Sequence, residues 1–360
     1  MKKALIVATV SGFVPQFEMN NVRILQEMGY EVHYASNFHN VSYGADNHRL
    51  DGTGIVCHQV DFVRSPFEWK ENFKALKQLK RVIKKGNYSL IHCHTPVGAV
   101  LTRLVCAEIS KKKKEFHLIY TAHGFHFYEG APLKYWLLFY PVECFLARYT
   151  DVLITINKED YERAKKFCKH KNVKVEYLSG VGIDMSYWSG KDLTEKERKE
   201  IRQKTRKELG VLDSEKMLLS VGELIPRKNH VSVIEGLEKW KQRSSIPFHY
   251  FICGQGVLKE DLQNLIKEKQ LEDCITLLGY RTDIRNLLYA TDLFVFPSKQ
   301  EGLPVALLEA VAAGVKVKAN NIRGNRELYQ ISKEELQAYD EKQVQKIMKY
   351  ILERELTNKE

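Results

Sequence analysis

Short apolar runs alternate with amphipathic stretches along almost the whole chain. In the first half these runs predict strands at residues 4–9, 31–35, 90–93, 118–122, 152–156 and 173–178. In the second half they predict strands at residues 218–221, 250–253, 275–278, 293–296 and 315–319. Helices are expected in most of the gaps, which is the pattern of a parallel sheet covered on both faces.

One break in this alternation divides the chain. The pattern stops around Ser179–Gly182, and a highly charged stretch follows to about Arg206. We therefore predict a Rossmann-like domain over 1–180, a second over 181–330 and a helical tail over 331–360. The predicted fold class is α/β, with two doubly wound domains facing across a cleft, because such domains bind ligands at their strand carboxyl ends. A length of 360 residues suits two domains of ordinary size.

A basic amphipathic helix is predicted from Lys70 to Lys85. Its apolar stripe consists of Phe73, Leu76, Leu79 and Ile83, at helical spacing. The remaining face carries seven Lys or Arg residues against one Glu. This one-sided charge supports contact with an anionic membrane surface and an ordinary surface helix about equally.

Composition narrows the classes of protein. Hydrophobic residues make up 44% and charged residues 28%, as in a soluble globular protein. The formal net charge of +11 favours an anionic partner, although the lysine run at 111–114 is interpreted as a solvated loop. Seven scattered cysteines without CxxC spacing indicate a reducing cytoplasm. We expect no signal peptide and no membrane-spanning helix, because the apolar runs are short and interrupted.

The candidate chemistry centres on two acidic residues that flank a predicted strand-to-helix turn. Glu301 precedes Gly302, Leu303 and Pro304 in the loop, and Glu309 follows one and a half turns inside the helix. An ionised carboxylate can accept both hydroxyls of a ribose diol, at about 1.5–3 kcal/mol for each charge-assisted bond. The alternative is that Glu301 caps the helix and Glu309 is merely exposed.

This stretch resembles the E-x7-E signature of retaining glycosyltransferase family 4, in its exopolysaccharide and capsule branch. Further motifs in the same order support the resemblance between Met1 and about Glu327: Ala8–Gly12, Ile91–Pro96, Tyr120–Phe127, Gly180–Asp184, Val221–Leu224 with Lys228–His230, and Leu278–Arg281. The resemblance implies the GT-B fold, with the first domain on the acceptor side and the second binding a nucleotide-sugar.

The resemblance also implies roles for residues of the second domain. Glu309 would bind the ribose, and Glu301 with the backbone of Gly302 and Leu303 would hold the donor sugar. Lys228, with Arg227, would neutralise the diphosphate, where cations stabilise the charge of the leaving group. Tyr280 would lie at the base contact.

In the first domain the resemblance singles out two positions. His123 matches a family histidine near the reacting sugar, and Gly12 lies in a loop that approaches donor and acceptor closely. The implied catalytic residues are thus His123, Lys228 and Glu301. Front-face attack by the acceptor is the family's usual route to retention, so no enzymic nucleophile is predicted.

The resulting functional prediction is a hexosyltransferase-type enzyme that needs neither metal nor cofactor. It would transfer a sugar from a nucleotide-sugar, a UDP-sugar by family habit, to a lipid-linked saccharide in surface polysaccharide biosynthesis. We expect it at the cytoplasmic face of the membrane, as a peripheral protein. Nucleic acid is not an expected partner, because no helix-turn-helix or aromatic stacking motif accompanies the charge.

Three features depart from the family pattern. Glu223 occupies a position where many relatives carry Arg, and Lys316 and Lys318 interrupt the last predicted strand. Only 33 residues follow Glu327, so the helical tail is predicted to be shortened relative to the family. A catalytically impaired binding or scaffold protein therefore stays open as an alternative. So does a nucleotide-sugar epimerase, which would need further acid/base carboxylates.

Four histidines could suggest a metal site. They are His92, His94, His123 and His126, and side chains two apart on a strand share a face. No Asp, Glu or Cys at ligand spacing completes the set. We therefore predict no metal site and interpret these residues as loop or core histidines.

Overall fold

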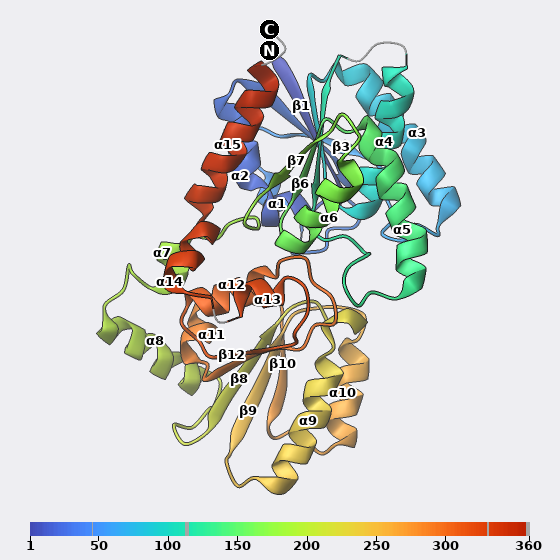
Figure 1. The fold of residues 1–360 in the computed structure, drawn as a ribbon. Coiled ribbons are helices and arrows are strands. Elements are labelled where there is room, and N and C mark those ends of the chain that lie inside the picture. The colour runs from blue at the N-terminus through green and yellow to red at the C-terminus, as the bar shows by residue number, and fades with distance from the viewer. Residues whose placement is uncertain (45, 112–114, 330, 358–360) are drawn as a thin grey trace. The chain divides into compact units, whose positions relative to one another are not determined.

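The computed structural model describes residues 1–44, 46–111, 115–329 and 331–357 (Figure 1). Residues 112–114 of the lysine run lie outside the described residues. The chain divides into two compact units, which are described separately. Unit 1 comprises Met1–Gly182 and Lys342–Glu360, and unit 2 comprises Ile183–Glu341. The chain thus passes from one unit to the other twice.

Unit 1 is built around a seven-stranded sheet in the order β3-β2-β1-β4-β5-β6-β7. Its strands are β1 (Lys2–Val10), β2 (Tyr30–Asn37), β3 (Val56–Gln59), β4 (Leu90–Cys93), β5 (His117–Ala122), β6 (Val152–Thr155) and β7 (Lys174–Tyr177). Its helices are α1 (Phe13–Phe17), α2 (Met19–Glu27), α3 (Trp69–Gly86), α4 (Pro96–Ser110), α5 (Leu133–Leu146), α6 (Lys158–Cys168) and α15 (Glu341–Thr357), with short 3₁₀ turns at His48–Leu50 and Ala147–Tyr149.

Helices cover both faces of this sheet. One apolar core joins the sheet to α3, α4 and α6, through residues such as Leu5, Leu79 and Val105. The opposite core joins it to α1, α2 and α15, through residues such as Ile6 and Leu25. In Figure 1 these two helix layers lie on either side of the strands. The run of buried residues along β1 follows from this burial on both faces.

Unit 2 contains a five-stranded sheet in the order β10-β9-β8-β11-β12. Its strands are β8 (Lys216–Val221), β9 (Phe248–Cys253), β10 (Ile275–Gly279), β11 (Leu293–Phe296) and β12 (Val317–Ala319). Its helices are α7 (Met185–Ser189), α8 (Glu195–Glu208), α9 (His230–Arg243), α10 (Lys259–Glu268), α11 (Ile284–Ala290), α12 (Val305–Ala312), α13 (Asn325–Leu328) and α14 (Lys333–Leu336), with 3₁₀ turns at Pro226–Lys228 and Gln337–Tyr339.

All the strand pairs within the two sheets are parallel. The strand order reverses beside β1 in unit 1, between β1 and β4. It reverses beside β8 in unit 2, between β8 and β11. Doubly wound sheets bind ligands at the carboxyl edge next to such a reversal. The prediction of two doubly wound α/β domains is confirmed, and the topology indicates where each could bind a ligand.

The basic helix is present as α3, but its apolar stripe is shorter than predicted. Ala75, Leu79 and Ile83 are buried, whereas Phe73 is 56% exposed. The amino-terminal end of α3 therefore presents Trp69 and Phe73 to solvent beside its lysines. Among the described residues, no helix combines the length and apolar character needed to cross a bilayer.

The predicted tail of 331–360 is not one element. Residues 331–341 belong to unit 2, where Ile183 and Asp340 form a parallel bridge. Helix α15 belongs to unit 1 instead and buries Met348, Ile351 and Leu352 in the core beside α2. The apolar face of α15 thus completes a core whose other members lie in the first half of the chain.

We predict that truncating this face destabilises unit 1. Leu352 is fully buried, so Leu352→Ala should lower the free energy of unfolding by about 2–5 kcal/mol. Tyr350→Ala on the exposed side of α15 should stay within about 0.5 kcal/mol. Amide hydrogen exchange of β1 reports the opening of unit 1 by itself. Equal protection of β1 in both variants would show that α15 contributes nothing to this core.

Candidate functional site

An ion pair bridges the strand reversal of unit 2. Lys228 follows β8 and Glu301 follows β11, and the Lys228 ammonium donates to Glu301 Oε1 at 2.7 Å. Arg227 donates to the same oxygen at 3.2 Å and to the Gln300 carbonyl at 3.1 Å. The side chain of Glu301 is 9% exposed and that of Lys228 13%. Opposite charges thus meet at the edge where the topology indicates a ligand.

The electrostatics of Glu301 are set by these neighbours. Burial by itself raises the pKa of a carboxyl group, because it disfavours the charged form. Lys228 and then Arg227 outweigh this effect, and together with hydrogen bonds they hold the pKa of Glu301 below its ordinary value. Glu301 is therefore ionised at neutral pH and offers acceptor oxygens to a ligand.

The Glu301 loop is held by residues that the sequence did not single out. Arg323 is 3% exposed and its Nε donates to the Glu301 carbonyl at 3.1 Å. A Cβ at Gly324 would lie 2.2 Å from the Gly302 carbonyl oxygen, so only glycine allows this packing. A lone arginine before a glycine is a weak sequence signal, because nothing local shows which loop it will contact.

The two other predicted donor contacts of unit 2 are Glu309 and Tyr280. Glu309 lies on α12, the helix after the Glu301 loop, and Tyr280 lies at the carboxyl end of β10. Glu309 is half-buried on α12, and burial raises the pKa of its carboxyl group to about 8. No hydrogen bond or ion pair engages this carboxyl among the residues described. Tyr280 follows β10 and is 45% exposed, next to an Arg281 that is paired with Asp283 at 2.7 Å. Leu303 is buried beneath the turn, and Gly302 is half-buried.

Gly12 and His123 lie at the corresponding edge of unit 1. A Cβ at Gly12 would stand 2.0 Å from the Ser42 carbonyl oxygen, so the glycine permits close packing of the chain's own loops. His123 directly follows β5 and its ring meets the edge of Phe13 at 5.0 Å between centroids. Burial lowers the pKa of His123 to about 4, so its imidazole is neutral at pH 7.

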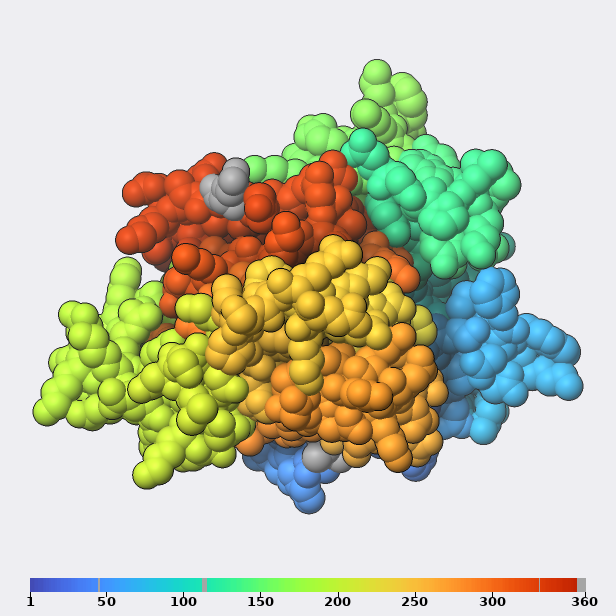
Figure 2. All heavy atoms as spheres, turned by 90° about the horizontal axis from the view of Figure 1, so that it is seen from below, coloured from blue at the N-terminus to red at the C-terminus, as the bar shows by residue number. Residues whose placement is uncertain are grey.

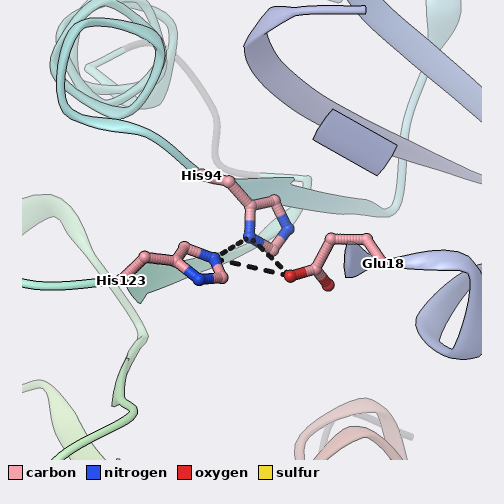
Figure 3. Close-up of side chains that lie close together, drawn as sticks. All are labelled: Glu18, His94 and His123. Atoms are coloured by element: carbon pink, nitrogen blue, oxygen red, sulfur yellow. Dashed lines mark hydrogen bonds and ion pairs between the residues drawn. The ribbon is translucent and has the colours of Figure 1, made fainter. Parts of the chain in front are cut away.

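His123 belongs to a cluster with His94 and Glu18 (Figure 3). His94 follows β4, and Glu18 separates α1 from α2. His94 Nδ1 lies 3.1 Å from His123 Nε2, and Glu18 Oε1 lies 3.5 Å and 3.4 Å from these two nitrogens. The sequence offers no acidic residue at ligand spacing, yet the structure places Glu18 beside these two histidines. Glu18 lies far from them in the sequence, so spacing could not reveal it.

The other two histidines of the predicted group do not join this cluster. His92 Nε2 contacts the Thr121 hydroxyl at 2.8 Å, and the His126 ring packs on Phe139 with centroids 4.5 Å apart. Both are accommodated as ordinary core and loop side chains.

A strained residue fixes the position of His94. The next residue, Thr95, has φ 61° and ψ 146°, a conformation that costs non-glycine residues about 1–3 kcal/mol. Its hydroxyl compensates by accepting from the Thr9 amide at 3.0 Å and by contacting the Thr9 hydroxyl at 2.7 Å. The carboxyl end of β1 thus anchors the segment that carries His94.

Two family models match the chain. The model for glycosyl transferases of group 1 matches residues 201–359, and that for glycosyl transferase 4-like proteins matches residues 3–157. Among curated relatives, the putative glycosyltransferase EpsD of Bacillus subtilis is 34% identical over 91% of this chain and 81% of its own. A UDP-Gal:alpha-D-GlcNAc-diphosphoundecaprenol alpha-1,3-galactosyltransferase of Escherichia coli is 32% identical over 79% of this chain and 69% of its own.

Solved structures give the same fold. HepE of Anabaena, in complex with UDP and glucose, superposes with a TM-score of 0.71 at 15% identity, over 98% of this chain and 100% of its own. Sucrose-phosphate synthase of Thermosynechococcus elongatus superposes with a TM-score of 0.71 at 14% identity, over 100% of both chains. The predicted GT-B fold is confirmed.

The buried carboxyl of Glu309 generates a pH-dependent prediction. Its pKa rises from 4.5 unfolded to about 8 folded, so the folded state binds more protons between these values and stability falls as pH rises through that window. Glu309→Gln should therefore raise the melting temperature at pH 8 but not at pH 4. After discounting for solvent, a gain of about 1 kcal/mol corresponds to roughly 2–4 °C.

Thermal denaturation of the ligand-free protein at several pH values measures this effect. Glu235→Gln is the matched control, because Glu235 is exposed on α9 in the same unit. A pH-independent difference between Glu309→Gln and the wild type would contradict the assignment.

Proposed function

The chain belongs to the family of group 1 and 4-like glycosyl transferases, and on this premise we propose that it transfers a sugar from a UDP-sugar to a lipid-linked saccharide, with retention of configuration at the sugar carbon. The observation that carries this proposal is the Lys228–Glu301 pair at the strand reversal of unit 2. It places a cation for phosphate beside a carboxylate for sugar hydroxyls. Glu309 lies on the helix that follows the same loop.

The proposed donor site needs no metal ion to hold the diphosphate. Lys228 and Arg227 supply two cationic groups, and the amino terminus of α12 adds backbone amides that no side chain caps. As the sugar leaves, negative charge grows on the diphosphate, and fixed cations stabilise that charge more than the ground state. Glu301, kept ionised, would accept hydrogen bonds from hydroxyls of the donor sugar.

The carboxyl of Glu309 suits the ribose of the nucleotide. Without a partner among the described residues, it gains two hydrogen bonds when a diol reaches it, and these favour its ionised form. The choice of UDP as the nucleotide of the donor draws support from HepE, which was solved in complex with UDP and glucose and with UDP-glucose. Tyr280, exposed after β10, is the proposed contact for the base.

The acceptor assignment draws on the relatives. The Escherichia coli relative is named for a diphosphoundecaprenol-linked acceptor, and a Campylobacter jejuni relative that is 34% identical over 32% of this chain is named likewise. In the proposed reaction the acceptor hydroxyl attacks from the face that the diphosphate leaves, and a phosphate oxygen accepts its proton. His123, neutral at pH 7, would orient the reacting sugar by hydrogen bonding rather than by charge.

A lipid-linked acceptor requires the protein to work at a membrane, and unit 1 has a surface suited to this. Helix α5 exposes Leu133, Leu137, Leu138, Val142 and Phe145. Helix α4 packs against both α5 and the basic helix α3, so the apolar and basic surfaces occupy the same face of the sheet (Figure 1). In Figure 2 both α3 (light blue) and α5 (teal) lie at the surface. We propose that this face binds anionic lipid at the cytoplasmic side of the membrane.

The donor site is tested by thermal-shift titration with UDP-, GDP- and ADP-sugars. A UDP-sugar should stabilise the wild type, and Glu309→Ala should weaken its binding roughly ten- to a hundredfold through loss of the charge-assisted hydrogen bonds. Glu235→Ala serves as the control and should bind as the wild type does. Equal shifts in wild type and Glu309→Ala would remove Glu309 from the site. Isomerisation of the donor without an acceptor would favour an epimerase instead.

The membrane surface is tested by sedimentation with anionic vesicles. Replacing both Leu133 and Leu137, which are 72% and 71% exposed, by Glu should weaken binding at least about tenfold, because each buried leucine contributes roughly 1.5–3 kcal/mol. Leu212→Glu is the matched control, since Leu212 is 65% exposed but lies in unit 2. Binding that survives the double substitution would show that α5 does not enter the bilayer.

A further inference from the structure

Three potential metal-ligand atoms converge in unit 1. They are Glu18 Oε1, His94 Nδ1 and His123 Nε2, from three separate segments of the chain. Figure 3 shows the three side chains pointing toward one another, with the three atoms at the corners of a triangle. The sides of this triangle measure 3.1, 3.4 and 3.5 Å.

The two distances from Glu18 Oε1 match a tetrahedral metal site, and the two nitrogens lie within hydrogen-bonding distance of each other. Zinc binds histidine nitrogen and carboxylate oxygen at about 2.0–2.2 Å, so tetrahedral angles place neighbouring ligand atoms roughly 3.3–3.6 Å apart. A charge-assisted hydrogen bond between imidazole and carboxylate would be shorter, at about 2.7–2.9 Å. Glu18 Oε1 is farther than this from both nitrogens. The carboxylate oxygen is thus directed at the space between the imidazoles rather than at either ring.

A second histidine pair in unit 1 shows what an ordinary contact looks like. His33 Nδ1 lies 2.7 Å from His58 Nε2, and the other nitrogen of His33 lies 2.6 Å from Glu31 Oε1. Here the carboxylate contacts the far side of one ring and does not converge with the two facing nitrogens. Both distances are those of short hydrogen bonds.

Burial distinguishes the Glu18 cluster further. Glu18 is 2% exposed and His94 is fully buried. Among the described residues, no lysine or arginine pairs with Glu18, and the only hydrogen-bonding contact of the His94 ring runs through Nδ1. The second carboxylate oxygen of Glu18 accepts from the Asn21 amide, which fixes its orientation. A buried carboxylate without a cation is costly, and a bound cation would compensate it.

We propose that Glu18, His94 and His123 bind one divalent transition-metal ion of the zinc class. Two imidazoles with one carboxylate suit Zn²⁺, whereas Mg²⁺ and Ca²⁺ prefer an all-oxygen set. Three protein ligands leave the fourth tetrahedral position open for water or a ligand oxygen.

This site takes no part in the proposed handling of phosphate in unit 2, but it shares His123 with the proposed reaction. The ion would hold Nε2 of His123 and leave its Nδ1 as the ring's remaining polar atom. The site can therefore be tested by metal binding alone, without donor or acceptor.

The experiment uses the full chain, stripped of metal and carrying no polyhistidine tag. Calorimetric titration with Zn²⁺ should show saturable binding of one ion per chain. Titration with Co²⁺, a spectroscopic substitute for zinc, should produce the intense visible absorption of a tetrahedral site. No saturable Zn²⁺ binding, or a weak six-coordinate Co²⁺ spectrum, would overturn the proposal.

Variants assign the ion to these residues. Glu18→Gln and His123→Asn should each weaken Zn²⁺ binding by about 100-fold or more, beyond the roughly 10–100-fold that loss of an outer hydrogen-bond partner costs. His58→Gln, in the control pair, should bind as the wild type does. Zn²⁺ affinity unchanged by His123→Asn would place the ion elsewhere. Circular dichroism checks folding, and the wild-type Co²⁺ spectrum decides the matter if Glu18→Gln does not fold.

Discussion

The rest of the structure depends on a constraint that parallel strands impose. Each parallel strand is followed by a crossover on one face of its sheet, so all strands of a unit end at the same edge. Both faces are then covered, and polar side chains avoid burial chiefly at that edge. In unit 1 the edge carries His94 and His123, and in unit 2 it carries Lys228 and Glu301. The topology therefore determines where chemistry can occur before individual contacts are considered.

The contact between Lys228 and Glu301 has a consequence for ligand binding. Both side chains are largely buried, so separating them without replacement leaves a poorly solvated charge, which costs several kcal/mol. A free phosphate would satisfy Lys228 but leave Glu301 with Arg227 alone. A sugar diphosphate can satisfy both groups, because its phosphate oxygens pair with the ammonium and its sugar hydroxyls donate to the carboxylate. In the proposed function, the pair would thus favour a ligand that carries both chemistries at once, which is a physical basis for selecting a nucleotide-sugar over its fragments.

The sequence predicted what depends on local pattern. Strands with continuous apolar runs, such as β1 and β8, were found where expected, because burial on both faces leaves a strong signal. The edge strand β3 was missed, since Val56–Gln59 is short and largely exposed and carries no apolar run. Phe73 was assigned to a buried stripe from helical spacing, but spacing does not tell how far along a helix the sheet beneath it extends.

What the sequence did not predict depends on contacts between distant segments. Glu18 belongs to no motif, and its meeting with His94 and His123 follows only from the adjacency of β1, β4 and β5. Arg323 likewise gains its meaning only when the segment after β12 folds against the Glu301 loop. The position of α15 could not be inferred either, because its amphipathic pattern specifies a buried face but not the unit that buries it.

The surroundings of three acidic residues indicate what each still lacks. Glu301 has its cations within the chain, so it requires only donors that can share it. Glu309 has no cation and no histidine as a partner among the described residues. Hydrogen bonds from hydroxyl donors are sufficient to stabilise its ionised form. Glu18 is buried deeper and faces two imidazole nitrogens that lie within hydrogen-bonding distance of each other, and in our proposal a metal ion would bind all three groups. Three carboxylates at the edges of two similar sheets therefore differ in chemistry because their neighbours differ, and the ligand proposed for each follows from the groups already beside it.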